Sequence, residues 1–444
     1  MNDLSSSDSH AWTVDTGLGA PPSTADNFGR IDKTQPKREA EKQVHPGSIP
    51  YAYAVTNLDF DVTENCNLGC LYCFKGEMYS RHMSLETMKK TFDWLLQASN
   101  TARSVNCNFM GGEPTMRWKQ IREFVPWARR RARAVGKQAT FSMTTNLTLF
   151  TEEMRQFIDD YGFGILMSID GCPEVQDAQR PAKNGKQVSQ VVEKWARSLL
   201  RTRPRSTARA TIHPDYVHRF AEGYRYLHSI GFAEVAVSGA EYDDWKPEHF
   251  EELDRQFAEM LEYTLEVKRS GGEINLTGWK YYINKLVQYR ATGRESEIEF
   301  MPSPCGAGKG YMMVDYTGDI WPCHRFDGAD TDAGAGGQFR MGNIYKDGFN
   351  HDLQRVFLDF DHGKVHKDTC TTCPANPVCG GYCLAANLSD THSIYSPHDT
   401  YCRWTWGMYE YAEKLYNRIA EEDGPEALEA LLASVANTRG AGDK

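Results

Sequence analysis

Apolar and polar residues alternate with a period of two in several short stretches of the first 240 residues. In the first stretch, Leu58, Phe60 and Val62 occupy alternate positions with polar residues between them. This pattern is typical of a strand with one buried face. The predicted strands are residues 58–63, 105–109, 139–146, 164–170, 206–212 and 234–239.

Helical periodicity follows each of these strands. The first helix is predicted after Ser84, a favourable N-cap residue that precedes apolar positions at helical spacing. Six successive β/α units with right-handed crossovers indicate an α/β protein with an open, partial (β/α)6 barrel, whose active site lies at the carboxyl ends of the strands. The other predicted helices are residues 118–134, 151–161, 186–201, 216–230 and 247–269.

The chain is expected to contain further regions with different character. Residues 1–48 are polar and lack an apolar period, so we expect a flexible N-terminal arm. The barrel is expected at 49–275 and a bridging helix within 276–300. Residues 301–405 are rich in Cys, Gly and Pro, which predicts a small domain held by metal rather than by a core. A C-terminal helix and a polar tail are expected at 406–444.

Charge and hydropathy exclude several classes of partner. The chain has 50 basic and 60 acidic residues, a formal net charge of −10, which argues against a nucleic acid or an anionic membrane. No apolar run is long enough to span a membrane, and the first residues do not resemble a signal peptide, so we expect a cytoplasmic protein. Its 12 cysteines indicate metal binding or catalysis rather than disulfides.

The first cysteine cluster, CNLGCLYC, follows the first predicted strand. It contains Cys66, Cys70 and Cys73 at the spacing C-x3-C-x2-C. Three thiolates would bind three irons of a [4Fe–4S] cluster and leave the fourth iron for another ligand, whereas a structural cluster uses four cysteines. The alternative is zinc, which needs a fourth ligand nearby and usually has paired C-x2-C units. The spacing therefore favours a cluster with an open iron.

This spacing, with an aromatic residue before the last cysteine, resembles the radical S-adenosylmethionine (SAM) superfamily. The resemblance extends to a GGEP motif at the end of the second strand, formed by Gly111, Gly112, Glu113 and Pro114. Glycines there would let the backbone approach a ligand closely, and in the family the glutamate accepts hydrogen bonds from the cofactor's ammonium group. The implied fold is a TIM-like radical SAM barrel.

Two later motifs resemble segments that line the family's cofactor pocket. Thr145 and Asn146 end the third strand, and Ser168 and Asp170 belong to the SIDG segment that ends the fourth. We expect Arg180 to pair with a carboxylate of the cofactor or the substrate, the alternative being a surface arginine. The resemblance implies that an electron from a donor such as flavodoxin or ferredoxin cleaves SAM, and that the 5′-deoxyadenosyl radical removes a hydrogen atom from the substrate.

Seven more cysteines form a second pattern between residues 305 and 402. They match the SPASM domain, whose cysteines read C-x9–15-G-x4-C, then C-x2-C-x5-C-x3-C and a final C. Two closed zinc sites are the alternative, but they would need eight ligands. By this resemblance, auxiliary cluster I has three ligands, Cys305, Cys323 and Cys383, and auxiliary cluster II has four, Cys370, Cys373, Cys379 and Cys402.

The resemblance thus implies three [4Fe–4S] clusters. Auxiliary cluster I would have three cysteine ligands, which leaves an iron for a substrate thiolate, water or a non-cysteine ligand. The two remaining cysteines, Cys107 and Cys172, are expected to be structural.

Enzymes with this combination of domains mostly modify peptides or proteins, so we expect a peptide or protein substrate. One hypothesis is a maturase that abstracts a hydrogen atom from a residue of a ribosomal peptide and forms a thioether or carbon–carbon cross-link. The alternative is an anaerobic sulfatase maturase, which oxidises Cys or Ser to formylglycine. A plain electron carrier is disfavoured, because it needs neither an open iron nor a cofactor pocket.

His324 distinguishes the two maturase hypotheses. Sulfatase maturases carry an aspartate directly after the cysteine that corresponds to Cys323, and this chain has His324 instead. An imidazole and a carboxylate differ in basicity by about two pKa units, which weakens the sulfatase hypothesis. His324 is the candidate catalytic residue, and three roles stay open for it: a base, a donor to auxiliary cluster I, or a structural residue.

Overall fold

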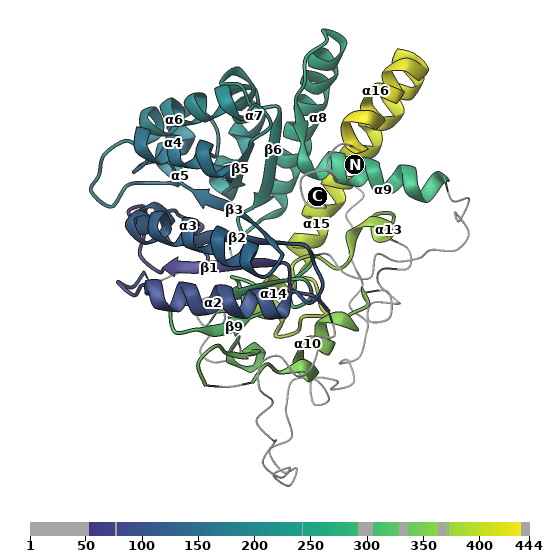
Figure 1. Ribbon diagram of the computed structural model, residues 1–444. Coiled ribbons are helices and arrows are strands. Elements are labelled where there is room, and N and C mark those ends of the chain that lie inside the picture. Colours follow the sequence, from purple (N-terminus) through teal and green to yellow (C-terminus); the bar gives the residue numbers. More distant parts are fainter. Residues whose placement is uncertain are drawn as a thin grey trace, which may run out of the picture. The chain divides into compact units, whose positions relative to one another are not determined.

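A 10-stranded sheet forms the centre of the protein in the computed structural model, with the strand order β10-β9-β8-β1-β2-β3-β4-β5-β6-β7 (Figure 1). The expected arm at 1–48 lies outside the described residues. The structure describes residues 53–75, 78–241, 243–291, 305–327, 336–346, 348–362, 370 and 373–436.

The barrel strands run parallel to one another, as each pairing from β1 to β7 shows. All the predicted strands are present, and a short seventh follows them. The prediction of an α/β fold with a mostly parallel sheet is therefore confirmed. The strands are β1 (Asn57–Thr63), β2 (Ser104–Gly111), β3 (Gln138–Thr145), β4 (Gly164–Ser168), β5 (Thr207–Ile212), β6 (Glu234–Gly239) and β7 (Asn275–Leu276).

Helices connect these strands and cover one face of the sheet. Ser84 caps the first of them by accepting a hydrogen bond from Thr87 N at 3.0 Å. Helix α5 was not predicted, because 7 residues are too few to show a helical period. The helices are α2 (Leu85–Ala98), η1 (Pro114–Arg117), α3 (Trp118–Ala134), α4 (Glu152–Tyr161), α5 (Pro173–Gln179), α6 (Ser189–Thr202), η2 (Pro214–Arg219), α7 (Phe220–Ser229), α8 (Pro247–Arg269) and α9 (Thr277–Ala291).

The two faces of the barrel strands differ in polarity. In β5, Ala208, Ala210 and Ile212 are buried beneath the helices, while the residues between them are polar and only half-buried. The same alternation of burial runs along β2 and β3. The inner face of the curved sheet is therefore polar and partly open, in contrast to a barrel interior packed with branched apolar side chains.

The cysteine-rich region extends the same sheet. Strand β8 (Tyr311–Val314) runs parallel beside β1, and β9 (Asp319–Trp321) and β10 (Gly342–Asn343) continue antiparallel from it. We expected this region to lack a core, and that part of the expectation is wrong, whereas its stabilisation by metal stays a prediction. Short strands of 4, 3 and 2 residues show no periodicity in the sequence, yet their apolar residues join the core of the barrel.

Three phenylalanines lie at the centre of this extension. The ring centroid of Phe326 lies 5.1 Å from that of Phe339 and 5.6 Å from that of Phe357. All three side chains are buried. Aromatic pairs at such separations stabilise a core beyond the area they bury.

The chain continues through further helices in the described residues. Helix α15 packs on α8 and α9, where Tyr411 contacts Phe257 and Trp279 at centroid distances of 5.6 and 6.4 Å. Helix α16 occupies part of the expected polar tail, and its Leu431 is buried. No described helix is long and apolar enough to cross a membrane. These helices are α10 (His351–Leu358), α13 (Asn376–Cys379), α14 (Leu384–Thr391), α15 (Asp399–Arg418) and α16 (Gly424–Ala436).

The Phe357→Ala substitution tests whether the cysteine-rich region has its own apolar core. We expect it to lower the free energy of unfolding by about 3–5 kcal/mol, because it leaves a cavity among buried rings. The exposed Leu149 provides the control, since Leu149→Ala should change stability by less than about 0.5 kcal/mol. Denaturant unfolding and hydrogen exchange of β8 and β9, in protein without iron, would measure the effect. If hydrogen exchange of β8 and β9 is the same in Phe357→Ala as in the wild type, the result would contradict an apolar core in this region.

Candidate active site

The loop with Cys66, Cys70 and Cys73 begins directly after β1. Three backbone hydrogen bonds join this loop to residues 179–183, at the end of α5 and directly after it. These backbone bonds limit how far the loop can move, so the three thiols keep their places. The bonds join Gly69 N to Pro181 O (2.8 Å), Leu71 N to Gln179 O (3.0 Å) and Lys183 N to Asn67 O (3.1 Å).

The three thiols lie close enough to act on one another. Burial raises the pKa of Cys66 to about 11 and that of Cys70 to about 12, and the charge of Cys73 adds to both effects. Binding of iron would therefore displace protons from these thiols. A donor set of three sulfur atoms fits an iron–sulfur cluster with three protein ligands.

The two glycines of the GGEP motif lie against the backbone that leads into this loop. A Cβ atom on Gly112 would lie 2.1 Å from Asn65 O and 2.9 Å from Cys66 N, and one on Gly111, whose φ is +134°, would lie 2.2 Å from Thr63 O. We expected these glycines to admit a ligand. In the structure they admit the backbone leading into Cys66, with Gly112 N donating to Thr63 O at 2.6 Å, and that they also bind the cofactor stays a prediction.

Glu113 joins the ends of β2 and β3. Its Oε1 accepts from Thr115 N, Thr115 Oγ1 and Thr145 Oγ1 at 3.0, 2.6 and 2.8 Å, and its Oε2 accepts from Asn146 N at 2.8 Å. Burial raises the pKa of Glu113, and these hydrogen bonds oppose the rise. The carboxylate was expected to bind the cofactor's ammonium group. Oε2, which accepts from Asn146 N, keeps room for such a bond. Pro114 opens η1 directly after it.

Two polar side chains lie at the ends of β3 and β4. Asn146 Nδ2 lies 3.1 Å from Asn67 Oδ1 and 3.8 Å from Cys66 Sγ, so this residue contacts the cysteine loop. Ser168 is the last residue of β4, and its hydroxyl makes no hydrogen bond to another described residue. At the carboxyl edge of the sheet, the Asn146 amide is therefore bound to the cysteine loop, while the Ser168 hydroxyl is available to bind a ligand.

Asp170 and Arg180 form a buried ion pair. Arg180 Nε and Nη2 each donate to the Asp170 carboxylate at 2.9 Å. Asp170 also accepts from Tyr72 Oη and from Thr211 N, the latter at 2.9 Å. Arg180 was expected to pair with a carboxylate of the cofactor or the substrate, and the structure pairs it with Asp170. Through Tyr72, this pair stabilises the loop between Cys70 and Cys73.

The seven C-terminal cysteines separate into two groups. Burial raises the pKa of Cys323, and the charges of Cys383 and Cys305 raise it further. Burial also raises the pKa of Cys402 to about 12, with contributions from Cys379, Cys370 and Cys373. These are the groups that the resemblance assigned to two auxiliary clusters, and that they bind iron stays a prediction. The groups are Cys305, Cys323 and Cys383, and Cys370, Cys373, Cys379 and Cys402.

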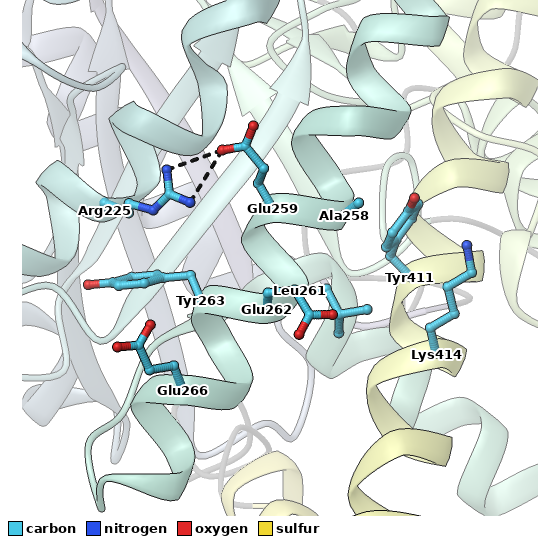
Figure 2. Close-up of a pocket in the computed structure, with 9 residues that line it drawn as sticks. All are labelled: Arg225, Ala258, Glu259, Leu261, Glu262, Tyr263, Glu266, Tyr411 and Lys414. Atoms are coloured by element: carbon cyan, nitrogen blue, oxygen red, sulfur yellow. Dashed lines mark hydrogen bonds and ion pairs between the residues drawn. The ribbon is translucent and has the colours of Figure 1, made fainter.

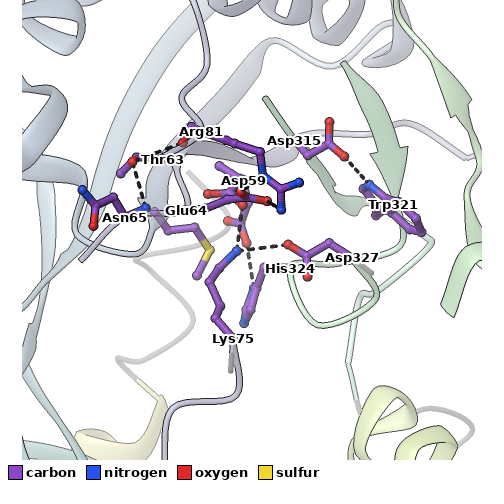
Figure 3. Close-up of polar contacts among 12 residues, drawn as sticks. Asp59, Thr63, Glu64, Asn65, Lys75, Arg81, Asp315, Trp321, His324 and Asp327 are labelled. Atoms are coloured by element: carbon purple, nitrogen blue, oxygen red, sulfur yellow. Dashed lines mark hydrogen bonds and ion pairs between the residues drawn. The ribbon is translucent and has the colours of Figure 1, made fainter. Parts of the chain in front are cut away.

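His324 lies beside the barrel interior, bound to β1 and β8. Its Nδ1 is 2.8 Å from Asp59 Oδ2 and 2.7 Å from Tyr311 Oη, and Tyr311 also donates to Asp59. Asn108 Nδ2 donates to Asp59 Oδ1 at 2.7 Å. Figure 3 shows His324 next to Asp59. Roles for Asp59 and Tyr311 were not predicted from the sequence. The polar positions of β1 were the available signal for Asp59, whereas the short β8 gave none for Tyr311.

A buried lysine connects the first cysteine loop to the region after Cys323. Lys75 Nζ lies 2.7 Å from Asp61 Oδ2 and 3.0 Å from Asp327 Oδ2 (Figure 3). Burial raises the pKa of Asp61 to about 6, against the opposing charge of Lys75. Since Asp61 belongs to β1, one ammonium group links the barrel, the first cysteine loop and the second cysteine region.

A separate groove lies on the outer helices. Figure 2 shows it between α8 and α15, with Arg225 bonded to Glu259 at 3.3 Å on one side and Lys414 on the other. None of the cysteines lines this groove. Its charged walls are typical of a solvated surface. The chemistry is therefore expected at the barrel interior.

The two remaining cysteines are buried. Cys107 is fully buried in β2 within the hydrophobic core, as expected for a structural residue. Cys172 is the N-cap residue of α5 and lies 3.2 Å from Arg219 Nη2. The burial of Cys107 and the contact of Cys172 with Arg219 are consistent with structural roles.

Comparison with known proteins identifies the first part of the chain. Residues 60–222 match the Radical SAM superfamily. An uncharacterized protein of Methanocaldococcus jannaschii is 32% identical over 130 residues, and the chain spans 43% of the length of this relative.

Longer matches include the cysteine-rich region. Mycofactocin maturase MftC of Mycolicibacterium smegmatis is 26% identical over 79% of this chain and 83% of its own length. A cysteine-type anaerobic sulfatase-maturating enzyme of Clostridium perfringens is 22% identical over 79% of this chain and 94% of its own.

Solved structures share the fold. Native anSMEcpe with bound AdoMet and Cp18Cys peptide aligns with a TM-score of 0.64 and 20% identity, over 82% of this chain and 98% of its own. Streptococcus suis SuiB bound to precursor peptide SuiA aligns with a TM-score of 0.52 and 15% identity, over 79% and 76%. At these identities the likeness concerns the fold alone.

The Gly112→Ala substitution tests the close contact between the GGEP motif and the cysteine loop. We expect it to displace Asn65 and Cys66, because the added methyl group would overlap backbone atoms. Iron bound at the first cysteine cluster should fall while iron at the other cysteines stays, as iron analysis and electron paramagnetic resonance would show. Gly337→Ala is the control, since nothing lies within 4 Å of its added Cβ. Full occupancy in Gly112→Ala would contradict the proposed role of the contact.

Proposed function

Residues 60–222 of this enzyme form a radical SAM domain, and from that premise we propose that the protein is a peptide maturase. It removes a hydrogen atom from a residue of a ribosomal peptide and forms a thioether or carbon–carbon cross-link. The observation that carries this proposal is that the charges of Cys305 and Cys383 act on the thiol of Cys323, and those of Cys370, Cys373 and Cys379 on the thiol of Cys402, as two separate sets. The long matches to maturases that include this region support it.

Each group of thiols would hold one [4Fe–4S] cluster. The first group leaves one iron for SAM, and the group of four closes its cluster. When bound, the clusters and SAM supply a 5′-deoxyadenosyl radical, which takes one hydrogen atom, and also an acceptor for one electron. The hydrogen atom, the electron and one released proton together account for the two hydrogens lost in a cross-link.

The residues at the carboxyl ends of the strands would orient the cofactor. Glu113 Oε2 and the Ser168 hydroxyl are the polar groups best placed to accept or donate further hydrogen bonds there. Thr145, Asn146 and the Asp170–Arg180 pair would act indirectly, because their side chains already hold Glu113 and the first cysteine loop. The polar inner face of the barrel would accommodate a peptide backbone.

His324 would accept the proton. A carboxylate oxygen of Asp59 accepts from His324 Nδ1, which favours the tautomer with its hydrogen on Nδ1 and leaves Nε2 as the base. The side chain is 26% exposed, so Nε2 can meet a substrate. Asp59 and Tyr311 would hold the ring in place for that transfer.

The group of Cys305, Cys323 and Cys383 favours the thioether over the carbon–carbon bond. It has three sulfur donors, and a soft thiolate from a substrate cysteine would complete it. The group lies next to the barrel interior, since the charge of Asp59 acts on the thiol of Cys323. A substrate cysteine bound there would be deprotonated near the site of hydrogen abstraction.

Replacing Cys66, Cys70 and Cys73 together by Ala tests the central assignment. We expect about twelve irons per reconstituted wild-type chain and about eight in the variant, because each [4Fe–4S] cluster holds four. The variant should not cleave SAM, as chromatography of 5′-deoxyadenosine would show. Cys172→Ala is the matched control and should keep both iron and cleavage. Continued cleavage of SAM by the triple variant would contradict the assignment of the SAM-binding cluster to Cys66, Cys70 and Cys73.

Incubation with a candidate precursor peptide that contains cysteine tests the reaction class. We expect a loss of two hydrogens and one free thiol fewer, because a thioether consumes a cysteine. Tandem mass spectrometry would locate the link, and alkylation would count the thiols. A product with every thiol still alkylatable would establish a carbon–carbon link and reject sulfur ligation. Formylglycine on a sulfatase-derived peptide would replace the cross-linking proposal by the sulfatase alternative.

A further inference from the structure

Three consecutive residues between Cys379 and Cys383 have a left-handed backbone. The φ angles of Gly380, Gly381 and Tyr382 are +68°, +92° and +64°. Glycine adopts this conformation readily, whereas a bulky residue with a Cβ atom is strained in it. Such strain persists only where the surrounding structure holds the residue in place. The backbone conformation of Tyr382 must therefore be maintained by the contacts of its side chain.

The hydroxyl and the ring of Tyr382 each have a partner. The hydroxyl donates to Glu241 Oε1 at 3.0 Å. The ring is stacked on that of Tyr401, with ring centroids 4.5 Å apart and an angle of 10° between the planes. Glu241 lies two residues after the end of β6, and Tyr401 belongs to α15. Tyr382 therefore joins the barrel to the last cysteine-containing helix.

The carboxylate of Glu241 also holds the segment that follows Cys323. Its second oxygen, Oε2, accepts from Arg325 Nη1, and the two side chains are only 9% and 17% exposed. Arg325 lies two residues after Cys323, and Tyr382 directly precedes Cys383. One carboxylate of the barrel therefore binds beside two of the three thiols of the same group.

The left-handed turn separates the two cysteines that it joins. Besides burial, the charge of Cys383 raises the pKa of the Cys323 thiol, and the charge of Cys379 raises the pKa of the Cys402 thiol. Each cysteine at an end of the turn therefore lies near a different group of thiols. Tyr401 directly precedes Cys402. The stacked ring pair thus connects a residue next to a thiol of one group with a residue next to a thiol of the other.

We propose that Tyr382 is a positioning residue that fixes Cys383 in its group of thiols, through Glu241 on one side and Tyr401 on the other. Its role is indirect, because the adjacent thiol would bind the iron. The inference rests on the proposed binding of iron by the two C-terminal groups. Backbone conformation alone favours glycine at this position, so the tyrosine side chain supplies a restraint that glycine lacks.

Two substitutions separate the contacts of Tyr382. Tyr382→Phe removes the hydrogen bond to Glu241 and keeps the ring, whereas Tyr382→Gly removes both contacts and relieves the backbone strain. His392→Gly is the matched control, because His392 is an exposed ring residue whose φ is also positive, at +57°. The full chains are reconstituted anaerobically and compared by iron analysis and by redox titration with electron paramagnetic resonance. The signal that is lost in Cys383→Ala identifies the cluster of the three-thiol group.

We expect about twelve irons in the wild type, in Tyr382→Phe and in His392→Gly, and about eight in Tyr382→Gly, which should lose the cluster at the three-thiol group. Tyr382→Phe should shift the midpoint potential of that cluster, because the potential responds to the placement and solvent exposure of the ligands. The signal of the first cysteine cluster is the internal reference and should stay. A residue with a merely structural role would lower stability without shifting the potential of one cluster.

A Tyr382→Phe enzyme with the wild-type potential overturns the inference, even if Tyr382→Gly does not fold. Retention of all irons in Tyr382→Gly also overturns it. Equal loss of iron in His392→Gly has the same consequence, since the backbone conformation and not the tyrosine would then be responsible. A wild type with only about four irons is a separate outcome, because it refutes the auxiliary clusters of the proposed function together with the inference that rests on them.

Discussion

The close approach of two backbone segments at the carboxyl edge of the sheet determines where the first cysteine loop begins. Gly111 and Gly112 end β2 so near the backbone of Thr63 and Asn65 that neither position has room for a Cβ atom. Glu113 N donates to Asn65 O at 2.9 Å, and its carboxylate then bonds the end of β3. One short motif therefore fixes the start of the cysteine loop and joins three strands. Any ligand of the first cysteine group depends on this contact, because it places Cys66.

Buried charges complete the support of that loop. Lys75 is held between Asp61 and Asp327, and Arg180 is held by Asp170. Breaking such a pair by removing one partner is costly, since it leaves an uncompensated charge away from water. These pairs connect the first cysteine loop to β1, to the segment after β4 and to the region after Cys323. The two cysteine regions are therefore coupled by ion pairs as well as by the shared sheet.

The scaffold by itself does not choose a reaction. Relatives that match most of this chain are named as maturases of different kinds, and one fold commonly carries several activities. The choice depends on side chains at the inner face of the barrel. In this chain they include His324 bonded to Asp59 and Tyr311, and a three-cysteine group beside them.

Features that depend on neighbours along the chain could be predicted from the sequence alone. Alternation such as that of Leu58, Phe60 and Val62 reports local burial, so the strands, most of the helices and the α/β class could be predicted from it. The C-x3-C-x2-C spacing likewise keeps three thiols within one loop. Motif resemblance, rather than spacing, supplied the grouping of the later cysteines.

Contacts between residues that are distant in the sequence follow from the tertiary arrangement. Strand β8 pairs with β1, although 4 residues without a period gave no signal for it. Arg180 is bound to Asp170, and the glycines of GGEP lie against the backbone of Thr63 and Asn65. Hydrogen bonds and ion pairs depend on which strands lie side by side, and periodicity along the chain reports burial without reporting the partner.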